Sequence, residues 1–281
     1  MTSNSIYTDF VEAIRPVFGL GEARSLARII REDVFGHQDL DTLSFAQAKK
    51  LKVIENQLVK GIPLQYILGV ADFYGLKLAV DSSVLIPRQE TESLVYEVIR
   101  FAQANQSGRR IKILDIGTGS GCIALALKKE IDWADILAVD VSIPALNVAR
   151  KNNQALGFCT RFEQFDVRDE KAWHRMGTYD IVVSNPPYIP PSERSQMPDY
   201  VLNNEPELAL FVPEEDAYLF YRKIGEFALG HLAENGLLAF EVNEFRAQAT
   251  ADVIKGLGYQ VELKNDLSGA PRVLLAYVSQ K

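Results

Sequence analysis

Three glycines stand close together in DIGTGSG, residues 115–121, directly after an apolar run that predicts a strand. Glycines at such a position let the backbone approach a ligand closely, and the helix that follows offers free N–H groups. The spacing is G-x-G-x-G, which differs from the dinucleotide-binding G-x-G-x-x-G, and no phosphate-binding lysine follows. The segment therefore predicts a ligand-binding loop, and the alternative is a tight turn that binds nothing.

Asp140 ends the next predicted strand, 19 residues after Gly121. An acid at this position can accept hydrogen bonds from both hydroxyls of a ribose. The alternative is a helix N-cap ahead of Ile143-Pro144, a role that Ser142 could also fill. Together with the glycine-rich loop, Asp140 indicates a nucleoside at this edge of the sheet.

A rigid loop, Asn185-Pro186-Pro187-Tyr188, follows another predicted strand. Two prolines remove two N–H donors and stiffen the turn, and the residue before a proline is held extended. The Asn185 oxygen and the Pro186 carbonyl can each accept a hydrogen bond from a planar NH₂ group, on which Tyr188 can stack. We therefore expect Asn185, Pro186 and Tyr188 to be catalytic, and the alternative is an ordinary proline-rich turn.

Strand–helix alternation from residue 111 onward must position these segments. Apolar strands separated by helices predict a mostly parallel sheet covered on both faces, and the last two strands lack a helix between them, so one should be antiparallel. Residues 186–213 read as a long loop. The seven predicted strands are 111–117, 135–140, 160–166, 179–185, 237–242, 259–265 and 271–278.

The region before this alternation has a different periodicity. Residues 1–72 show helical spacing of apolar residues and predict a small helical bundle. Residues 73–80 and 84–86 predict a β-hairpin whose turn is 81–83. We therefore expect an α/β protein with a helical bundle at 1–72, a β-hairpin linker at 73–86 and a catalytic domain at 87–281.

Composition restricts the possible partners. The 281 residues include 30 basic and 37 acidic side chains, a net charge of −7, which argues against a broad nucleic-acid-binding surface. Two cysteines match no zinc or disulfide pattern, and no apolar run approaches the ~20 residues of a membrane span. The start of the chain does not read as a signal peptide. We expect a cytoplasmic monomer with no metal, membrane or nucleic-acid partner.

The combination of DIGTGSG, Asp140 and NPPY resembles the class I S-adenosylmethionine-dependent methyltransferases that methylate planar nitrogens. Further segments make the chain from residue 61 onward similar to the peptide chain release factor glutamine methyltransferases, the HemK/PrmC family. Residues 86–92 resemble the family's I-P-R-P-D-T-E, from which Gln89 and Glu90 depart, and whether this changes specificity stays open. The segments 61–69, 205–210 and 266–272 resemble G-x-P-x-x-Y-I-x-G, E-P-x-x-A-L and D-x-x-G-x-x-R.

The resemblance implies a seven-stranded class I methyltransferase sheet, with the helical bundle recognising the substrate protein. It implies methyl transfer from S-adenosylmethionine, leaving S-adenosylhomocysteine, to the amide nitrogen (N5) of the glutamine in the Gly-Gly-Gln motif of release factors. The residues implied in donor binding are Asp115, Gly117, Thr118, Gly119, Ser120, Gly121, Asp140, Asp166, Val167 and Asn185. Those implied in substrate binding are Arg88, Glu92, Asn185, Pro186, Pro187 and Tyr188.

Several alternatives stay open at this point. Asp166 could be a helix cap, and Arg88 and Glu92 could form surface salt bridges. A ribosomal-protein glutamine methyltransferase, or a DNA or rRNA amino-group methyltransferase, would share the NPPY loop, although the acidic charge speaks against a nucleic-acid substrate. The third function is a non-catalytic binding module, against which the intact glycine loop, Asp140 and NPPY argue.

Overall fold

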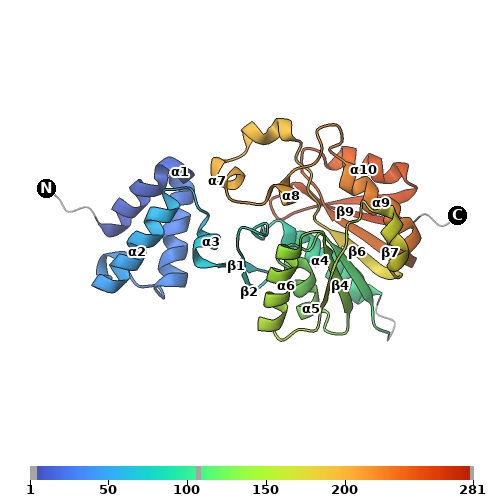
Figure 1. The fold of residues 1–281 in the computed structure, drawn as a ribbon, viewed down its shortest axis with the longest axis horizontal. Helices are drawn as coiled ribbons and strands as arrows, with labels where there is room; N and C mark the ends of the chain where they lie inside the picture. The colour runs from blue at the N-terminus through green and yellow to red at the C-terminus, as the bar shows by residue number, and fades with distance from the viewer. Residues whose placement is uncertain (1–4, 106–108, 279–281) are drawn as a thin grey trace. The chain divides into compact units, whose positions relative to one another are not determined.

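The computed structural model describes residues 5–105 and 109–278, which form one large sheet with helices on its faces and a group of helices (Figure 1). The chain divides into two compact units. One unit comprises Met1–Gly69 and Gln196–Asn204, and the other comprises Val70–Ser195 and Glu205–Lys281. The short segment Gln196–Asn204 thus leaves the region that the sequence assigned to the catalytic domain.

The first unit contains helices and no strand among its described residues. Gly19 interrupts its first helix with a φ of 76°, and Ser44 and Gln47 form a capping box at the start of the second. Its α-helices are α1 (Ile6–Ile29), α2 (Phe45–Leu58), α3 (Leu64–Leu68) and α7 (Asp199–Leu202), and Ile30–Val34 and Leu40–Thr42 are a π-helix and a 3-10 helix. The Tyr200 ring of α7 packs on Phe18 with centroids 5.0 Å apart, and Asn204 Nδ2 donates to the Gly61 carbonyl at 2.9 Å. These contacts explain why the segment belongs to this unit.

A β-hairpin opens the second unit, but its turn lies elsewhere than predicted. β1 (Val70–Phe73) and β2 (Leu76–Ala79) pair antiparallel across the two-residue turn Tyr74-Gly75. The predicted turn at 81–83 is wrong, and residues 84–86 form no strand. Both turn residues have positive φ, 48° and 68°, as a tight hairpin turn that matches strand twist requires. Glu92 Oε1 accepts the Tyr74 N–H at 2.7 Å and Lys129 Nζ donates to its carbonyl at 3.0 Å, which holds a tyrosine in this unusual conformation.

The main sheet has seven strands in the order β5-β4-β3-β6-β7-β9-β8. β9 runs antiparallel to both of its neighbours and the other pairs are parallel, which confirms the predicted sheet. The strands are β3 (Lys112–Ile116), β4 (Asp135–Asp140), β5 (Arg161–Gln164), β6 (Tyr179–Ser184), β7 (Leu232–Glu241), β8 (Tyr259–Asn265) and β9 (Pro271–Val278). Since β3 lies beside both β4 and β6, the chain direction around the sheet changes at β3.

Helices cover both faces of this sheet (Figure 1). One buried apolar cluster joins strand residues to α4 (Thr91–Ala104), α5 (Cys122–Glu130) and α6 (Ile143–Ala155). A second cluster, built from the alternate residues of the same strands, joins them to α9 (Leu219–His231) and α10 (Ala247–Gly256). In the described residues, no helix is long and apolar enough to cross a membrane.

The segment 186–213 is more ordered than the predicted long loop. It contains a 3-10 helix at Pro191–Gln196, α7 and α8 (Glu207–Leu210), each too short to show a helical period in the sequence. Ile189 and Phe211 form a bridge that joins the two ends of the segment. The bridge therefore holds together the two ends of the segment that follows the proline-rich loop.

Candidate active site

A cavity of about 140 Å³ lies at the carboxyl edge of the sheet, beside β3, β4, β5 and β6. Open α/β sheets bind ligands in this place because parallel strands all deliver their following loops there. The predicted site residues that line it are Gly117, Gly119, Asp140, Asp166, Val167, Asn185, Pro186 and Pro187. Residues from all three predicted motifs thus meet in one cavity.

The glycines of the loop after β3 have two different functions. Gly117 and Gly119 have φ values of 76° and 55° and line the cavity, and a Cβ on either would meet no heavy atom within 4 Å. Gly121 has a φ of 84°, but a Cβ there would lie 3.2 Å from Ala149 Cβ and 3.2 Å from Leu125 Cδ1. The first two glycines open space beside the cavity, whereas Gly121 permits close packing of α5 and α6.

The side chains of the glycine-rich loop are buried away from the cavity. Asp115, Thr118 and Ser120 do not line it, and Asp115 Oδ2 accepts a hydrogen bond from the Thr118 hydroxyl at 2.6 Å. Burial raises the pKa of Asp115 to about 7, and its Oδ1 has no partner in the described part of the chain. Asp115 and Thr118 therefore stabilise the loop through a buried hydrogen bond.

Asp140 connects the loop after β4 with the glycine-rich loop. Its Oδ1 accepts the Ser142 N–H at 2.8 Å and its Oδ2 accepts the Gly119 N–H at 2.9 Å. Burial raises the pKa of Asp140, and these backbone hydrogen bonds act in the opposite direction. The N-cap of α6 is Ser142, which accepts from the Ala145 N–H, so Asp140 lines the cavity without capping the helix.

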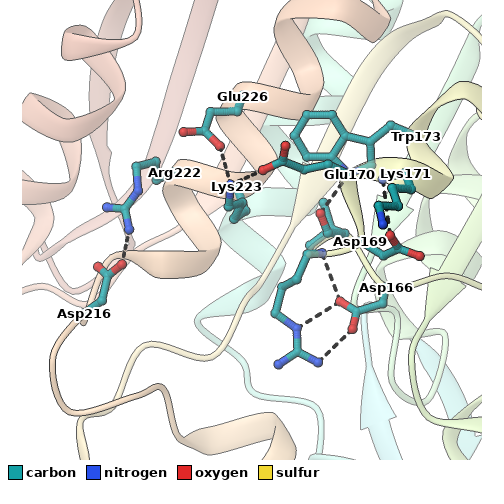
Figure 2. A network of polar contacts seen from close by, with 11 residues as sticks. Asp166, Asp169, Glu170, Lys171, Trp173, Asp216, Arg222, Lys223 and Glu226 are labelled. Atoms are coloured by element: carbon teal, nitrogen blue, oxygen red, sulfur yellow. Dashed lines mark hydrogen bonds and ion pairs between the residues drawn. The ribbon is translucent and has the colours of Figure 1, made fainter.

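Asp166 and Val167 line the cavity just beyond β5. Arg168 Nε and Nη2 lie 2.9 and 2.8 Å from the two carboxylate oxygens of Asp166, and this hydrogen bonding lowers the pKa of Asp166. Figure 2 shows Asp166 in a wider network of polar contacts with Asp169 close by. Asp169, which accepts the Lys171 N–H, caps the helix Glu170–Arg175. The helix-cap alternative therefore applies to Asp169 instead of Asp166.

Asn185, Pro186 and Pro187 of the proline-rich loop line the cavity. Ser184, the last residue of β6, donates to the Ile116 carbonyl at 2.7 Å and fixes the start of the loop against β3. Asn185 Nδ2 donates to Thr91 Oγ1 at 3.3 Å, which leaves Asn185 Oδ1 as the acceptor side of the amide. Tyr188 does not line the cavity and packs against the apolar cluster of α9 and α10. Burial raises the pKa of Tyr188 to about 12.

Arg88 and Glu92 lie outside the cavity lining. Arg88 Nη2 pairs with Glu205 Oε1 at 2.5 Å, and the Glu205 side chain is only 1% exposed. Glu92 accepts the Tyr74 N–H described above. Arg88 therefore fixes the segment that leads into α8, and Glu92 fixes the hairpin turn.

Sequence reasoning missed several residues of the cavity. Leu208 and Ala209 belong to the segment 205–210, which resembles E-P-x-x-A-L, and Phe165 directly precedes Asp166. Their positions in the sequence, inside a recognisable segment or next to a predicted site residue, could have identified these three residues. Phe220, in α9, carried none because its place depends on how a distant helix packs.

Comparison with known proteins identifies the family. The Methyltransferase small domain family matches residues 99–201. The release factor glutamine methyltransferase of Flavobacterium psychrophilum is 38% identical over 276 residues, which cover 95% of this chain and 96% of that protein. The one from Bacteroides thetaiotaomicron is 39% identical over 282 residues, with 97% and 99% covered. The chain belongs to the release factor glutamine methyltransferase family.

Membership of the release factor glutamine methyltransferase family confirms the resemblance seen in the sequence and makes the chain a methyltransferase. A solved structure described as the delta-N METTL16 MTase domain aligns with a TM-score of 0.52 and 19% identity, covering 74% of this chain and 90% of that one. This likeness concerns the fold alone. No cluster of three or more potential metal-ligating side chains occurs among the described residues.

Proposed function

We propose that this enzyme transfers a methyl group from S-adenosylmethionine to the side-chain amide nitrogen (N5) of the glutamine in the Gly-Gly-Gln motif of peptide chain release factors. The observation that carries the proposal is the position of Asn185 and Pro186. Both line the same cavity as Gly117, Gly119 and Asp140. A site for a planar amide therefore adjoins a site with the features of a nucleoside pocket.

The cavity residues fit the proposed methyl donor. The space beside Gly117 and Gly119 admits a ligand close to the backbone, and Asp140 offers a carboxylate to ribose hydroxyls. Phe165 and Val167 provide apolar surface for a flat ring. When bound, S-adenosylmethionine supplies a methyl group on a positively charged sulfur, which activates the methyl group for transfer.

The protein's own residues must prepare a weak nucleophile. The lone pair of an amide nitrogen is delocalised into its carbonyl, so the nitrogen has to be positioned and its lone pair directed. Asn185 Oδ1 and the Pro186 carbonyl can accept one N–H each, which favours a pyramidal nitrogen and stabilises its growing positive charge. No histidine or cysteine is among the described residues that line the cavity. We therefore assign no general base.

The family also supports a protein substrate for this chain. The relatives from Flavobacterium psychrophilum and Bacteroides thetaiotaomicron are named for release factor glutamine and match over nearly the full chain. The second unit carries every residue that lines the cavity. We assign recognition of the release factor to the helical unit, and we place the reaction in the cytoplasm, where release factors function, with the monomer as the active form.

A competition between acceptors tests this function. Radiolabelled methyl transfer should be measured side by side with a release factor, the same factor with Gln→Ala in its Gly-Gly-Gln motif, total ribosomal protein, DNA and rRNA. We expect label only on the intact release factor. Label on ribosomal protein or on nucleic acid instead would replace this function with one of the alternatives that share the NPPY loop.

A further inference from the structure

Two exposed apolar side chains lie on turns at the carboxyl edge of the sheet. Phe245 is 89% exposed and Leu267 is fully exposed. Phe245 lies in the turn 243–246, which follows β7, and Leu267 lies in the turn 266–270, which joins β8 to β9. Because β7 is parallel to β6 and β9 is antiparallel to β7, both turns lie at the edge of the sheet that also carries the cavity.

Each turn is ordered by hydrogen bonds to an Asn or Asp side chain. Asn243 Oδ1 accepts the Phe245 N–H at 2.9 Å. Asp266 Oδ1 accepts the N–H groups of Ser268 and Ala270 at 2.9 and 3.1 Å, and the Asp266 N–H donates to the Ala270 carbonyl at 2.8 Å. Side-chain hydrogen bonds of this kind fix the backbone of a turn, so both exposed apolar residues stand on ordered backbone.

One arginine joins the two turns. Arg272 Nε lies 3.2 Å from Asp266 Oδ2, and Arg272 Nη2 lies 3.8 Å from Glu244 Oε2. The side chains of Arg272 and Asp266 are only 14% and 6% exposed, so solvent screens this ion pair little. Each of the two acids directly precedes an exposed apolar residue, in Glu244-Phe245 and in Asp266-Leu267. The arginine thus holds the two turns, and with them Phe245 and Leu267, beside each other.

A further ion pair joins the turn after β7 to the segment that follows the proline-rich loop. Arg246 pairs with Glu193, which lies in the 3-10 helix of that segment. Glu193 comes five residues after Tyr188, the last residue of the proline-rich loop, and Arg246 directly follows Phe245. The exposed apolar surface is therefore tied to the loop that carries the proposed acceptor site.

A protein substrate has to cover this part of the sheet edge. A release factor is far larger than the cavity of about 140 Å³, so its surface must lie on neighbouring residues when its glutamine reaches Asn185. Specific protein–protein interfaces bury about 800 Å² on each partner, and buried aromatic side chains contribute much of their affinity. Apolar side chains on ordered turns suit such a contact, because they lose little conformational entropy on binding.

We propose that Phe245 and Leu267 form a docking surface for an apolar patch that the release factor carries beside its Gly-Gly-Gln segment. The inference rests on the proposed function, because the partner is the protein that brings the acceptor glutamine. Neither residue lines the cavity, so neither acts on the methyl donor. The surface determines the affinity for the protein substrate and adds a contact on the second unit to the recognition that we assign to the helical unit.

Steady-state methyl transfer to a release factor at saturating donor tests the docking role. Phe245→Ser and Leu267→Ser should each raise KM for the release factor by about tenfold, while kcat and donor affinity stay at their wild-type values. Phe245→Leu keeps an apolar side chain and should have a KM close to that of the wild type. Leu229→Ser is the matched control, because Leu229 is also exposed but lies near the end of α9, which leads into the opposite end of β7.

Three results would overturn the inference. The first is an unchanged KM in either serine variant, or a KM in Leu229→Ser that rises as far as theirs. The second is a lower kcat or a weaker donor affinity without a change in KM, because the two residues would then act on the cavity. The third is a wild-type protein that sediments as a dimer and becomes monomeric in Phe245→Ser, which would assign the surface to a second copy of this chain.

Binding measured without methyl transfer separates this inference from the proposed function. Calorimetry should use the release factor with Gln→Ala in its Gly-Gly-Gln motif, and we expect it to bind Phe245→Ser about tenfold more weakly than the wild type. If this difference is found but the wild type leaves the intact factor unlabelled, the docking surface stands and the proposed function is wrong. If the wild type labels the intact factor but both enzymes bind with equal affinity, the proposed function stands and the docking surface is wrong.

Discussion

The glycine-rich loop after β3 and the proline-rich loop after β6 lie at the same edge of the sheet and prepare it in opposite ways. Gly117 and Gly119 expose backbone and leave space, because both adopt left-handed conformations without a side chain. Asn185 and Pro186 line the same cavity on a chain that two prolines stiffen. The first loop is suited to binding, and the second is suited to holding a reacting group in a fixed direction.

Each loop has a hydrogen bond that involves a threonine hydroxyl. In the glycine-rich loop the Thr118 hydroxyl donates to Asp115, three residues earlier, whereas in the proline-rich loop Asn185 Nδ2 donates to Thr91 Oγ1, 94 residues earlier. The comparison teaches that the glycine-rich motif contains its own support, while the Asn185 amide is held by a residue outside its motif.

Asp140→Ala should have the largest effect of these variants, and we expect this effect on the affinity for S-adenosylmethionine alone. The variant loses two charge-assisted hydrogen bonds to ribose hydroxyls, each worth about 1.5–3 kcal/mol, so S-adenosylmethionine affinity should fall roughly 10²–10⁴-fold. Isothermal titration calorimetry measures this directly. Asp140→Asn is the control, because it retains an acceptor for the Gly119 N–H. Unchanged affinity in Asp140→Ala would contradict the assignment of the glycine-rich loop to donor binding.

Asn185→Ala should affect turnover instead of binding. One preorganised acceptor for the substrate NH₂ is lost, which typically lowers kcat by about 10²–10³-fold. Asn185→Asp keeps an acceptor but loses the N–H that Thr91 accepts, so it should also be slow. Single-turnover rates and donor titrations on the same samples separate the two effects. A wild-type rate for Asn185→Ala at saturating donor would make the proline-rich loop a scaffold only.

Asp115→Asn should change the pH dependence of stability. The pKa of Asp115 rises from an unfolded value of about 3.9 to about 7 in the folded protein, so the folded state binds more protons between these values. Stability of the wild type therefore falls as the pH rises from about 4 to about 7, and it falls no further above that range. Asparagine does not titrate, so the variant should gain stability relative to the wild type across this window.

Thermal melting of both proteins at several pH values between 4.5 and 8 measures this gain. The difference in unfolding free energy should grow by about 1–4 kcal/mol over the window. Glu241→Gln should behave in the same way, since burial also raises the pKa of Glu241. A constant difference in melting temperature at every pH would show that Asp115 does not titrate as its burial requires.

Gly119→Ala should have the smallest effect and is best compared with Gly157→Ala. Both glycines have positive φ, 55° and 69°, and neither would bring a Cβ within 4 Å of another atom, so both variants should lose about 1–2 kcal/mol of stability. Gly119 lines the cavity and Gly157 does not. Calorimetry should therefore show donor affinity about tenfold lower only in Gly119→Ala. Equal donor affinity in the two variants would remove Gly119 from the binding surface.

The sequence predicted the sheet and its two loops because both leave local signals. Apolar runs mark each strand, and DIGTGSG and NPPY stand directly at strand ends. The hairpin turn was misplaced because Tyr74 is held in a left-handed conformation by Glu92 and Lys129, which come from two later helices. Local propensity contains no information about such partners.

Other contacts near the site could not be predicted because they too join residues that are distant in the sequence. Thr91 reads as an ordinary first residue of a helix, and only the fold brings its hydroxyl to Asn185 Nδ2, 94 residues further along the chain. Arg88 was predicted to contact the substrate, yet its partner Glu205 lies 117 residues away along the chain. Pairings over such distances depend on tertiary packing, which residue spacing does not encode.

The membership of Gln196–Asn204 in the helical unit has a consequence for synthesis on the ribosome. The residues through Gly69 are made first, but the Tyr200 ring that packs on Phe18 and the Asn204 amide that binds the Gly61 carbonyl follow roughly 135 residues later. At about 5–20 residues per second, the last segment of the helical unit is made roughly 7 to 27 seconds after Gly69. During translation the whole of Val70–Ser195, the first segment of the other unit, is therefore made before the helical unit is complete.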